Sequence, residues 1–145
     1  MNKKVKLIIE IAVFVVLLVV IACIYNFSDS NREELEAEAG NVGVVKITDE
    51  NFNQEVIESD KPVILEFSSN SCPPCVAILT TLIDIAKNNK EIKVATINVD
   101  AKDSADTLAR YPVDGTPTIM IFEDGQIKST LVGAVDETTI MNELK

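Results

Sequence analysis

The motif Cys-Pro-Pro-Cys at residues 72–75 lies where a strand pattern changes to a helical pattern, and this junction constrains the fold most. Before it, residues 62–68 form a nearly continuous apolar run, which predicts a strand buried on both faces. After it, residues 76–87 carry apolar side chains at helical spacing. Two cysteines at such a junction can share one disulfide, with the first sulfur at the helix N-terminus. The motif therefore predicts disulfide exchange with another protein.

Strand and helix patterns alternate along the chain on both sides of this motif. Strands are expected at residues 44–47, 62–68, 92–99, 118–122 and 127–132. Helices are expected through residues 52–57, 76–87, 104–111 and 136–144, the last capped by Asp136. The order βαβαβαββα, with a turn at Asp124-Gly125 closing a hairpin, predicts an α/β fold. Its central mixed sheet should be flanked by helices on both faces.

An apolar segment near the N-terminus predicts a membrane anchor. From Leu7 to Phe27 the only charged residue is Glu10. At about 1.5 Å per residue, a helix of this length spans a hydrocarbon core of roughly 30 Å. A buried helix of a soluble protein would show a recurring polar face, and none is evident here. Residues 1–27 are therefore expected to form a single transmembrane helix, a signal anchor.

The charges on either side of this segment predict its orientation. The basic residues Lys3, Lys4 and Lys6 precede it, and a mostly acidic stretch follows it. Because positively charged flanks stay on the cytoplasmic side, the N-terminus should be cytoplasmic and everything after Phe27 extracytoplasmic.

Cys23 leaves a second form of anchoring open. Residues 20–23, Val-Ile-Ala-Cys, loosely resemble a bacterial lipobox, in which the cysteine is lipidated after cleavage. Glu10 within the apolar run and the apolar residues 24–27 fit that alternative less well, so a membrane-buried Cys23 is preferred. A cleaved and released protein is less favoured still, because no small-x-small cleavage site follows the run.

The composition excludes several classes of function. The net charge of the chain is −10. Residues 1–27 carry three lysines and one glutamate, a net charge of +2, so the remaining residues carry a net charge of −12. A domain this acidic has no electrostatic footprint for nucleic acid. The chain has no histidine, which excludes histidine-dependent catalysis and histidine-ligated metals. Zinc usually needs four ligands, so two cysteines could hold it only across a dimer. No metal and no cofactor is therefore expected.

Residues 28–42 are polar and acidic, with a stretch from Glu33 to Ala39 able to form a short helix. This segment is expected to be an acidic linker that holds the domain off the membrane. The globular domain is then expected to comprise residues 43–145.

From about Val44 to Lys145 the chain resembles the thioredoxin family. The matching segments are the strand at 63–67, the Cys-x-x-Cys at 72–75, Asn-Val-Asp at 98–100, and Tyr-Pro-Val-Asp-Gly-Thr-Pro-Thr at 111–118. A Cys-x-x-Cys after a buried strand, followed some 40 residues later by Thr-Pro-Thr opening another strand, is a specific combination. The resemblance implies the thioredoxin fold.

The chain also departs from the usual pattern of the family. Ser71 stands where the family usually has tryptophan, and the chain has no tryptophan at all. Pro73 replaces the usual glycine. Glu66 matches the buried aspartate of the family, and Thr96 replaces a lysine often found near it.

The resemblance implies a role for each residue of the site. Cys72, with its pKa lowered at the helix N-terminus, would attack the disulfide of a client protein, and the more buried Cys75 would resolve the mixed disulfide. Glu66 would be the internal acid or base, its pKa raised by desolvation. The alternative for Glu66 is an exposed carboxylate at the strand end. The implied substrate-binding residues are Pro73, Pro74, Thr116 and Pro117, with a cis Thr116–Pro117 bond beside Cys72.

The direction of electron flow stays open at this stage. No long insertion separates the helix after the cysteines from the next strand, which favours a reductase over the oxidase class. Such a reductase would act on client proteins outside the membrane and would need a transmembrane thiol electron carrier. A disulfide-forming oxidase or isomerase is the alternative, because the compartment is oxidising. A non-catalytic binding module is a further alternative.

Overall fold

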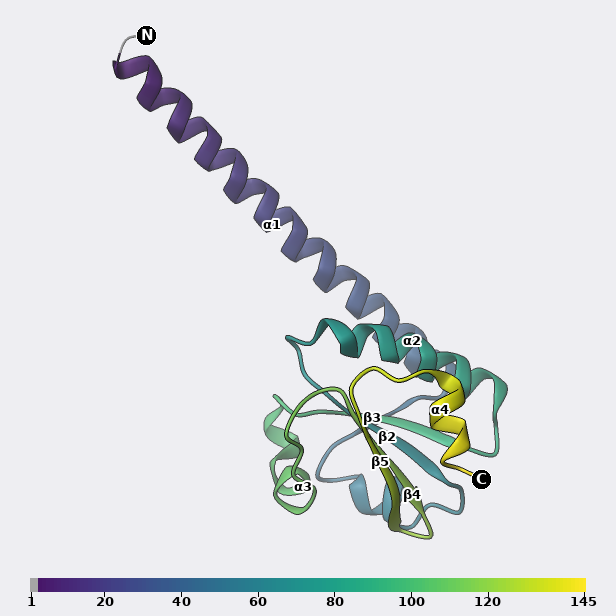
Figure 1. Cartoon of the computed structure of the whole chain (residues 1–145). Coiled ribbons are helices and arrows are strands. Elements are labelled where there is room, and N and C mark those ends of the chain that lie inside the picture. Colours follow the sequence, from purple (N-terminus) through teal and green to yellow (C-terminus); the bar gives the residue numbers. More distant parts are fainter. Residues whose placement is uncertain (1–2) are drawn as a thin grey trace. The chain divides into compact units, whose positions relative to one another are not determined.

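The computed structural model describes residues 3–145, and it describes side chains for residues 5–24 and 31–145. The chain divides into two compact units, Met1–Glu34 and Leu35–Lys145. The first helix, α1 (Lys3–Val42), contributes to both units (Figure 1). The side chains of Lys3, Lys4 and Phe27, which bear on the predicted anchor, lie outside the described part.

The N-terminal unit contains one apolar helical segment. Within α1, residues Val5–Ile24 are long and apolar enough to cross a membrane, and their side chains are exposed. A soluble helix of this composition would bury its apolar face. The segment could therefore be a membrane anchor or a signal sequence.

The C-terminal unit is built on a five-stranded mixed sheet. The strands are β1 (Val45–Ile47), β2 (Val63–Ser68), β3 (Lys93–Asn98), β4 (Thr118–Glu123) and β5 (Gln126–Val132), in the order β1-β3-β2-β4-β5. β3 pairs with β1 and β2 in parallel, and β4 pairs with β2 and β5 in the antiparallel sense. The predicted mixed sheet is confirmed.

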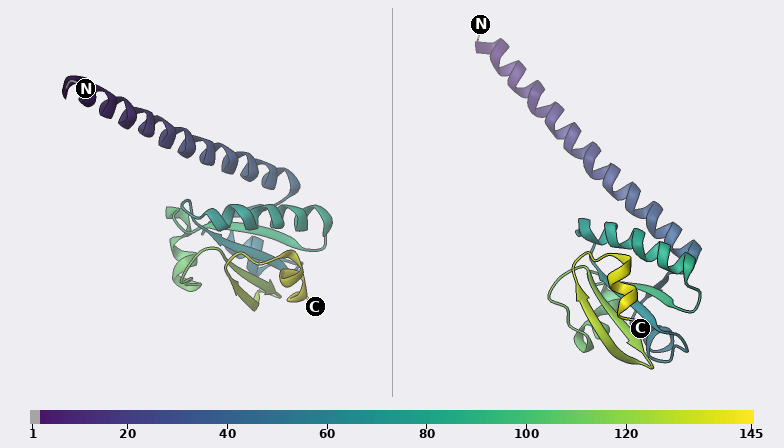
Figure 2. Two further views of the ribbon diagram at one scale, coloured as in Figure 1. Left: turned by 45° about the horizontal axis from the view of Figure 1, so that its top comes forward. Right: turned by 45° about the vertical axis from the view of Figure 1, so that its right-hand side comes forward.

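Helices cover both faces of this sheet, as the alternating pattern predicted. The elements are η1 (Asn53–Ile57), α2 (Pro73–Asn88), η2 (Lys102–Ser104), α3 (Ala105–Arg110) and α4 (Glu137–Asn142). One core cluster joins α2 and α4 to the face of β2 that carries Ile64. The other joins η1 and the end of α3 to the opposite face, which carries Leu65 and Phe67. Both views in Figure 2 show α2 running along one side of the sheet.

Several local features differ from the sequence-based expectation. The helix expected around Phe52 is a five-residue π-helical turn, η1. The helix expected at 104–111 is a short 3₁₀ turn followed by α3, because Asp103 has non-helical backbone angles (φ −85°, ψ 17°). The hairpin turn forms as predicted, with positive φ at Asp124 (52°) and Gly125 (74°), which suits a two-residue turn.

The last turns of α1 belong to the C-terminal unit, although they fall in the expected linker 28–42. Ala39 is only 5% exposed, and Leu35 and Val42 pack against the α2 side of the core. These three residues recur at i, i+4 and i+7, which places them on one helix face. Lys87 Nζ of α2 also donates to Glu38 Oε1 at 2.8 Å. The compact C-terminal unit therefore includes the end of α1 from Leu35 onward. The boundary between linker and globular domain at residues 42 and 43 stays a prediction.

The cap of α4 predicts a measurable pH dependence of stability. Asp136 Oδ1 accepts a hydrogen bond from Thr139 N at 2.7 Å, and hydrogen bonds from the Thr139 side chain and backbone lower the pKa of Asp136. A lowered pKa means that the ionised form stabilises the fold, so its contribution is complete above the unfolded value of 3.8 and is lost as the pH falls through the folded value. We expect Asp136→Ala to lower the melting temperature by a few degrees at neutral pH. The difference from the unchanged chain should shrink in acid.

Thermal unfolding followed by circular dichroism at a series of pH values measures this effect. Asp136→Asn is the matched control, because it keeps an oxygen acceptor for the Thr139 amide but cannot ionise. A loss of stability in Asp136→Ala that stays constant down to strongly acidic pH would contradict the ionised cap.

Candidate active site

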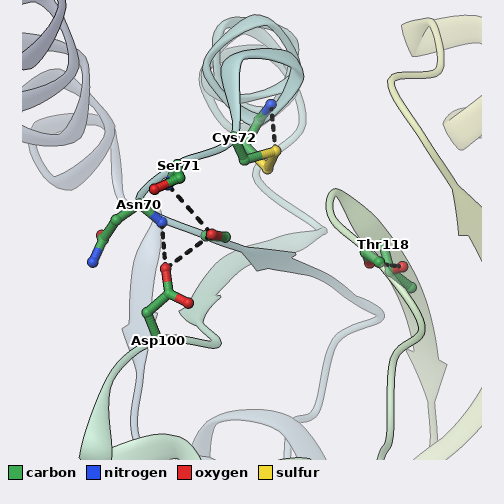
Figure 3. The surroundings of a disulfide bond; sticks show 8 residues. Asn70, Ser71, Cys72, Asp100 and Thr118 are labelled. Carbon is green, nitrogen blue, oxygen red and sulfur yellow. Dashed lines mark hydrogen bonds between the residues drawn. A yellow bond between two sulfur atoms is a disulfide. The ribbon is translucent and has the colours of Figure 1, made fainter. Parts of the chain in front are cut away.

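The cysteine motif forms a disulfide at the start of α2. Cys72 Sγ and Cys75 Sγ are 2.09 Å apart, and the two Cα atoms are 5.3 Å apart. Figure 3 shows this bond at the end of the helix, below its first turn. The predicted pairing of the two cysteines is confirmed. The remaining cysteine, Cys23, is a free and exposed thiol.

The first turn of α2 presents one amide donor to the Cys72 sulfur. Cys72 is the N-cap residue in an extended conformation (φ −122°, ψ 91°), and its Sγ accepts a hydrogen bond from Cys75 N at 3.2 Å. Pro73 and Pro74 occupy the first two helical positions and have no N–H. The amide of Cys75 is thus the first backbone donor of the helix. When the disulfide is reduced, this donor and the helix dipole favour a thiolate at Cys72 over a neutral thiol.

The two cysteines differ slightly in burial. Cys72 is 6% exposed and Cys75 is 2% exposed, while Ser71, Pro73 and Pro74 around them are exposed. Both cysteines are buried, Cys75 slightly more than Cys72, and the exposed residues lie next to Cys72 in the chain.

Glu66 is buried within the sheet, on the face that α2 covers. It is 1% exposed and lies in register between Thr96 of β3 and Ile119 of β4. Because side chains alternate along a strand, Glu66 shares the face of β2 that carries Ile64, and that face packs against α2. Glu66 is therefore not an exposed carboxylate at the strand end, the alternative that the sequence left open.

A cleft lies next to the loop that leads into Cys72. It has a volume of about 370 Å³ and is lined by Ser69, Val99, Leu108, Pro112, Val113, Asp114, Gly115 and Thr116. Ser69 belongs to the loop before the cysteines, and residues 112–116 belong to the segment that leads to Pro117. The cleft therefore lies between two segments that are far apart in sequence. Its walls combine apolar side chains with one carboxylate, that of Asp114.

The Thr116–Pro117 peptide bond is cis, as the resemblance implied. Pro117 is buried, and its carbonyl accepts a hydrogen bond from Gly133 N at 2.8 Å. Thr116 thus lines the cleft, and the adjacent Pro117 is buried. Sequence reasoning named both residues but missed most of the lining of the cleft. The signal for that lining was the turn-rich stretch at residues 111–116.

The described residues show no cluster of three or more cysteine or acidic side chains arranged to bind a metal ion. Both sulfurs of the motif are committed to the disulfide in this structure. The arrangement of this site is suited to thiol–disulfide chemistry.

Comparisons with known proteins agree with this geometry. The sequence model of the family named Thioredoxin matches residues 43–145. Thioredoxin 1 of Synechococcus elongatus is 39% identical over 99 residues, which cover 68% of this chain and 91% of that protein. Thioredoxin of Pseudomonas aeruginosa is 35% identical over 98 residues, covering 67% of this chain and 89% of that protein. Thioredoxin of Griffithsia pacifica is 35% identical over 105 residues, covering 72% and 94%.

Proposed function

The chain belongs to the thioredoxin family and is a thiol–disulfide oxidoreductase with a redox-active Cys72–Cys75 pair, and on this premise we propose that it works as a membrane-anchored reductase. Its clients would be disulfide-containing proteins outside the membrane. The observation that carries the proposal is the Cys72–Cys75 disulfide at the N-terminus of α2, with the helix amide of Cys75 donating to the sulfur of Cys72.

The proposed reaction consists of two exchanges of sulfur partners. The thiolate of reduced Cys72 attacks one sulfur of the client disulfide, forms a mixed disulfide and releases the first client thiolate. Cys75 then loses its proton and attacks Cys72 Sγ, which forms the Cys72–Cys75 disulfide and releases the second client thiolate. Two electrons pass to the client, and the protein is left oxidised. The greater burial of Cys75 supports its role as the second, resolving cysteine.

We assign the proton transfer at Cys75 to Glu66. Burial increases the proton affinity of a carboxylate, so the ionised form of a buried Glu66 is a better acceptor for a thiol proton than an exposed carboxylate would be. Its burial and its place on the α2 side of β2 support this role. The role of Glu66 would be to accept the proton that Cys75 loses before it attacks.

We propose Pro73, Pro74, Thr116 and Pro117 as the residues that bind the client. Pro73 and Pro74 are exposed at the start of α2, and Thr116 lines the cleft that Ser69 shares. An extended client segment could pair with the backbone near Thr116 and Pro117, in the way that a strand adds to an exposed edge. The client sulfur would then lie next to Cys72.

Reductase activity is proposed over oxidase or isomerase activity for two reasons. The relatives named above are thioredoxins, and α2 leads into β3 within a few residues, without an inserted helical subdomain. As a reductase outside the membrane, the protein would need electrons from a transmembrane thiol carrier. An oxidase or isomerase is the alternative, because extracytoplasmic compartments are oxidising. A binding module without catalysis is disfavoured by the intact cysteine pair.

For its location we propose residues 1–27 as a signal anchor with a cytoplasmic N-terminus, followed by a short acidic linker and an extracytoplasmic domain. The apolar segment Val5–Ile24 and the basic residues before it support this topology. A lipid anchor at Cys23 is the alternative.

The redox potential tests the direction of electron flow. For a reductase we expect the Cys72–Cys75 couple of the full-length chain to have a reduction potential of about −270 mV, the value typical of thioredoxins. Equilibration with glutathione and dithiothreitol buffers, followed by thiol trapping and mass measurement, gives this value. Cys23→Ser should leave the potential unchanged, and Cys72→Ser should abolish the couple. A reduction potential of about −120 mV, typical of a strong oxidase, would refute the reductase assignment.

The role of Glu66 is tested by separating the two exchange steps. We expect Glu66→Gln to slow the release of the client from the mixed disulfide by about 100-fold, the lower range for loss of an acid–base group, and to leave the first attack nearly unchanged. Stopped-flow measurements with a fluorescent disulfide peptide resolve both steps. Glu58→Gln is the control, because Glu58 is exposed. Equal slowing of the two steps would remove Glu66 from the proton transfer.

The topology is tested by adding protease to intact cells from which any cell wall or outer membrane has been removed, so that only the cytoplasmic membrane protects proteins. We expect added protease to degrade the domain without detergent, because it lies outside the cytoplasmic membrane. Cys23→Ser should remain membrane-bound with an unchanged mass apart from the substitution, since the helix itself is the anchor. A domain that is degraded only after detergent treatment would place it in the cytoplasm and contradict the proposal.

A further inference from the structure

The loop that leads from β2 into Cys72 is held by a side chain from another strand. Asp100, two residues after the end of β3, accepts hydrogen bonds at its Oδ2 atom from Asn70 N (2.7 Å) and from Ser69 Oγ (2.8 Å). Figure 3 shows the Asp100 carboxylate pointing at this loop. Hydrogen bonds to an ionised acceptor are shorter and stronger than neutral ones.

Ser69 extends this contact toward the cysteine. Its Oγ atom donates to Asp100 and accepts a hydrogen bond from Ser71 N at 3.3 Å. The Oδ2 atom of Asp100 therefore holds the amide of Asn70 directly and the amide of Ser71 through the hydroxyl group of Ser69. The loop is only three residues long, so its conformation determines where Cys72 begins the helix.

The side chain of Asn98 forms a second link between Asp100 and the loop. Asn98 Oδ1 accepts from Asp100 N at 2.9 Å, and Asn98 Nδ2 donates to Asn70 Oδ1 at 2.8 Å. The backbone adds one more link, from Val99 N to Ser68 O at 2.8 Å. The end of β3 and the loop before the cysteines are thus joined at several points, with Asp100 at the centre.

The two prolines make Cys72 unusually dependent on its position. A helix N-terminus ordinarily offers several free amides, so a displaced sulfur could exchange one donor for another. In α2 the first two positions are prolines, and the sulfur of Cys72 accepts from Cys75 N alone among the described contacts. Because hydrogen bonds weaken steeply with misalignment, a small shift of the sulfur would lose this donor.

We propose that Asp100 is a positioning residue, which holds the loop at Ser69–Ser71 so that the sulfur of Cys72 stays on the amide of Cys75. The proposal rests on the exchange chemistry assigned above to Cys72. Asp100 acts through the loop and does not itself take part in the reaction. Its contacts with Ser69 and Asn70 fix the loop that leads to the reactive sulfur.

The reactivity of Cys72 in the reduced full-length chain tests this role. The rate of alkylation of Cys72 by iodoacetamide, followed by mass measurement over a pH series, reports the pKa of its thiol. The alkylation rate plotted against pH has an inflection at the pKa of the Cys72 thiol. We expect Asp100→Ala to move this inflection upward by about one pH unit, the order expected for losing a contact at a helix N-terminus. Below the inflection this corresponds to roughly tenfold slower alkylation.

Asp100→Asn separates positioning from charge. It keeps an oxygen that can accept from Asn70 N and Ser69 Oγ, so the inflection should stay close to that of the unchanged chain. If Asp100 acted only through its charge, both variants would move the inflection downward, because removal of a negative charge favours a thiolate. The other titratable groups of the site, Glu66 and Cys75, are the same in all variants. Asp103→Asn, a change of an exposed acid in η2, controls for net charge.

Ser69→Ala provides a second, milder test. It interrupts the link to Ser71 N and leaves Asn70 N bonded to Asp100, so a smaller upward shift is expected. An unmoved inflection in both Asp100→Ala and Ser69→Ala, or a downward shift in both Asp100 variants, would overturn the proposal. Alkylation requires no client disulfide, so a failure of this proposal is distinguishable from a failure of the proposed reductase function.

Discussion

The burial of β2 on both faces is the constraint on which the rest of the molecule depends. All six residues from Val63 to Ser68 are buried, and this strand pairs with β3 on one side and β4 on the other. Each fully buried aliphatic or aromatic side chain contributes roughly 1.5–3 kcal/mol to the free energy of folding. The strand is therefore held firmly within the sheet, and the loop that follows it carries Cys72 into α2.

The chemistry of the site follows from what happens at the end of this strand. The chain leaves the sheet at Ser68 and enters α2 at Cys72, so the sulfur lies at the positive end of a helix that packs on the sheet. The same strand places Glu66 beneath α2, in the interior. One buried strand thus positions both the reactive disulfide and the carboxyl group proposed to serve it, and the cleft beside Ser69 adds a place for a client segment.

Local patterns predicted the elements well where the pattern was strong. The apolar run before the cysteines, the helical spacing after them and the Asp-Gly turn each correspond to an element of the structure. The prediction was weaker for short segments, because only packing decides them. Around Phe52 the chain forms a π-helical turn, with the Phe52 ring buried against Tyr111 and Phe122. The stripe of Leu35, Ala39 and Val42 was visible in the sequence, but its acidic neighbours concealed that it packs on the domain.

The sequence by itself determined the alternation of strands and helices, the cysteine pair at a helix start and the apolar N-terminal segment, because hydrophobic periodicity and residue spacing are local properties. Only the tertiary structure decided which distant segments meet. Asp100 reaches Ser69 across 31 positions, and Ser69 and Thr116 line one cleft. These contacts depend on the order of strands in the sheet, which places the end of β3 beside the end of β2. No local pattern encodes that order, because it results from how all the elements bury their apolar faces together.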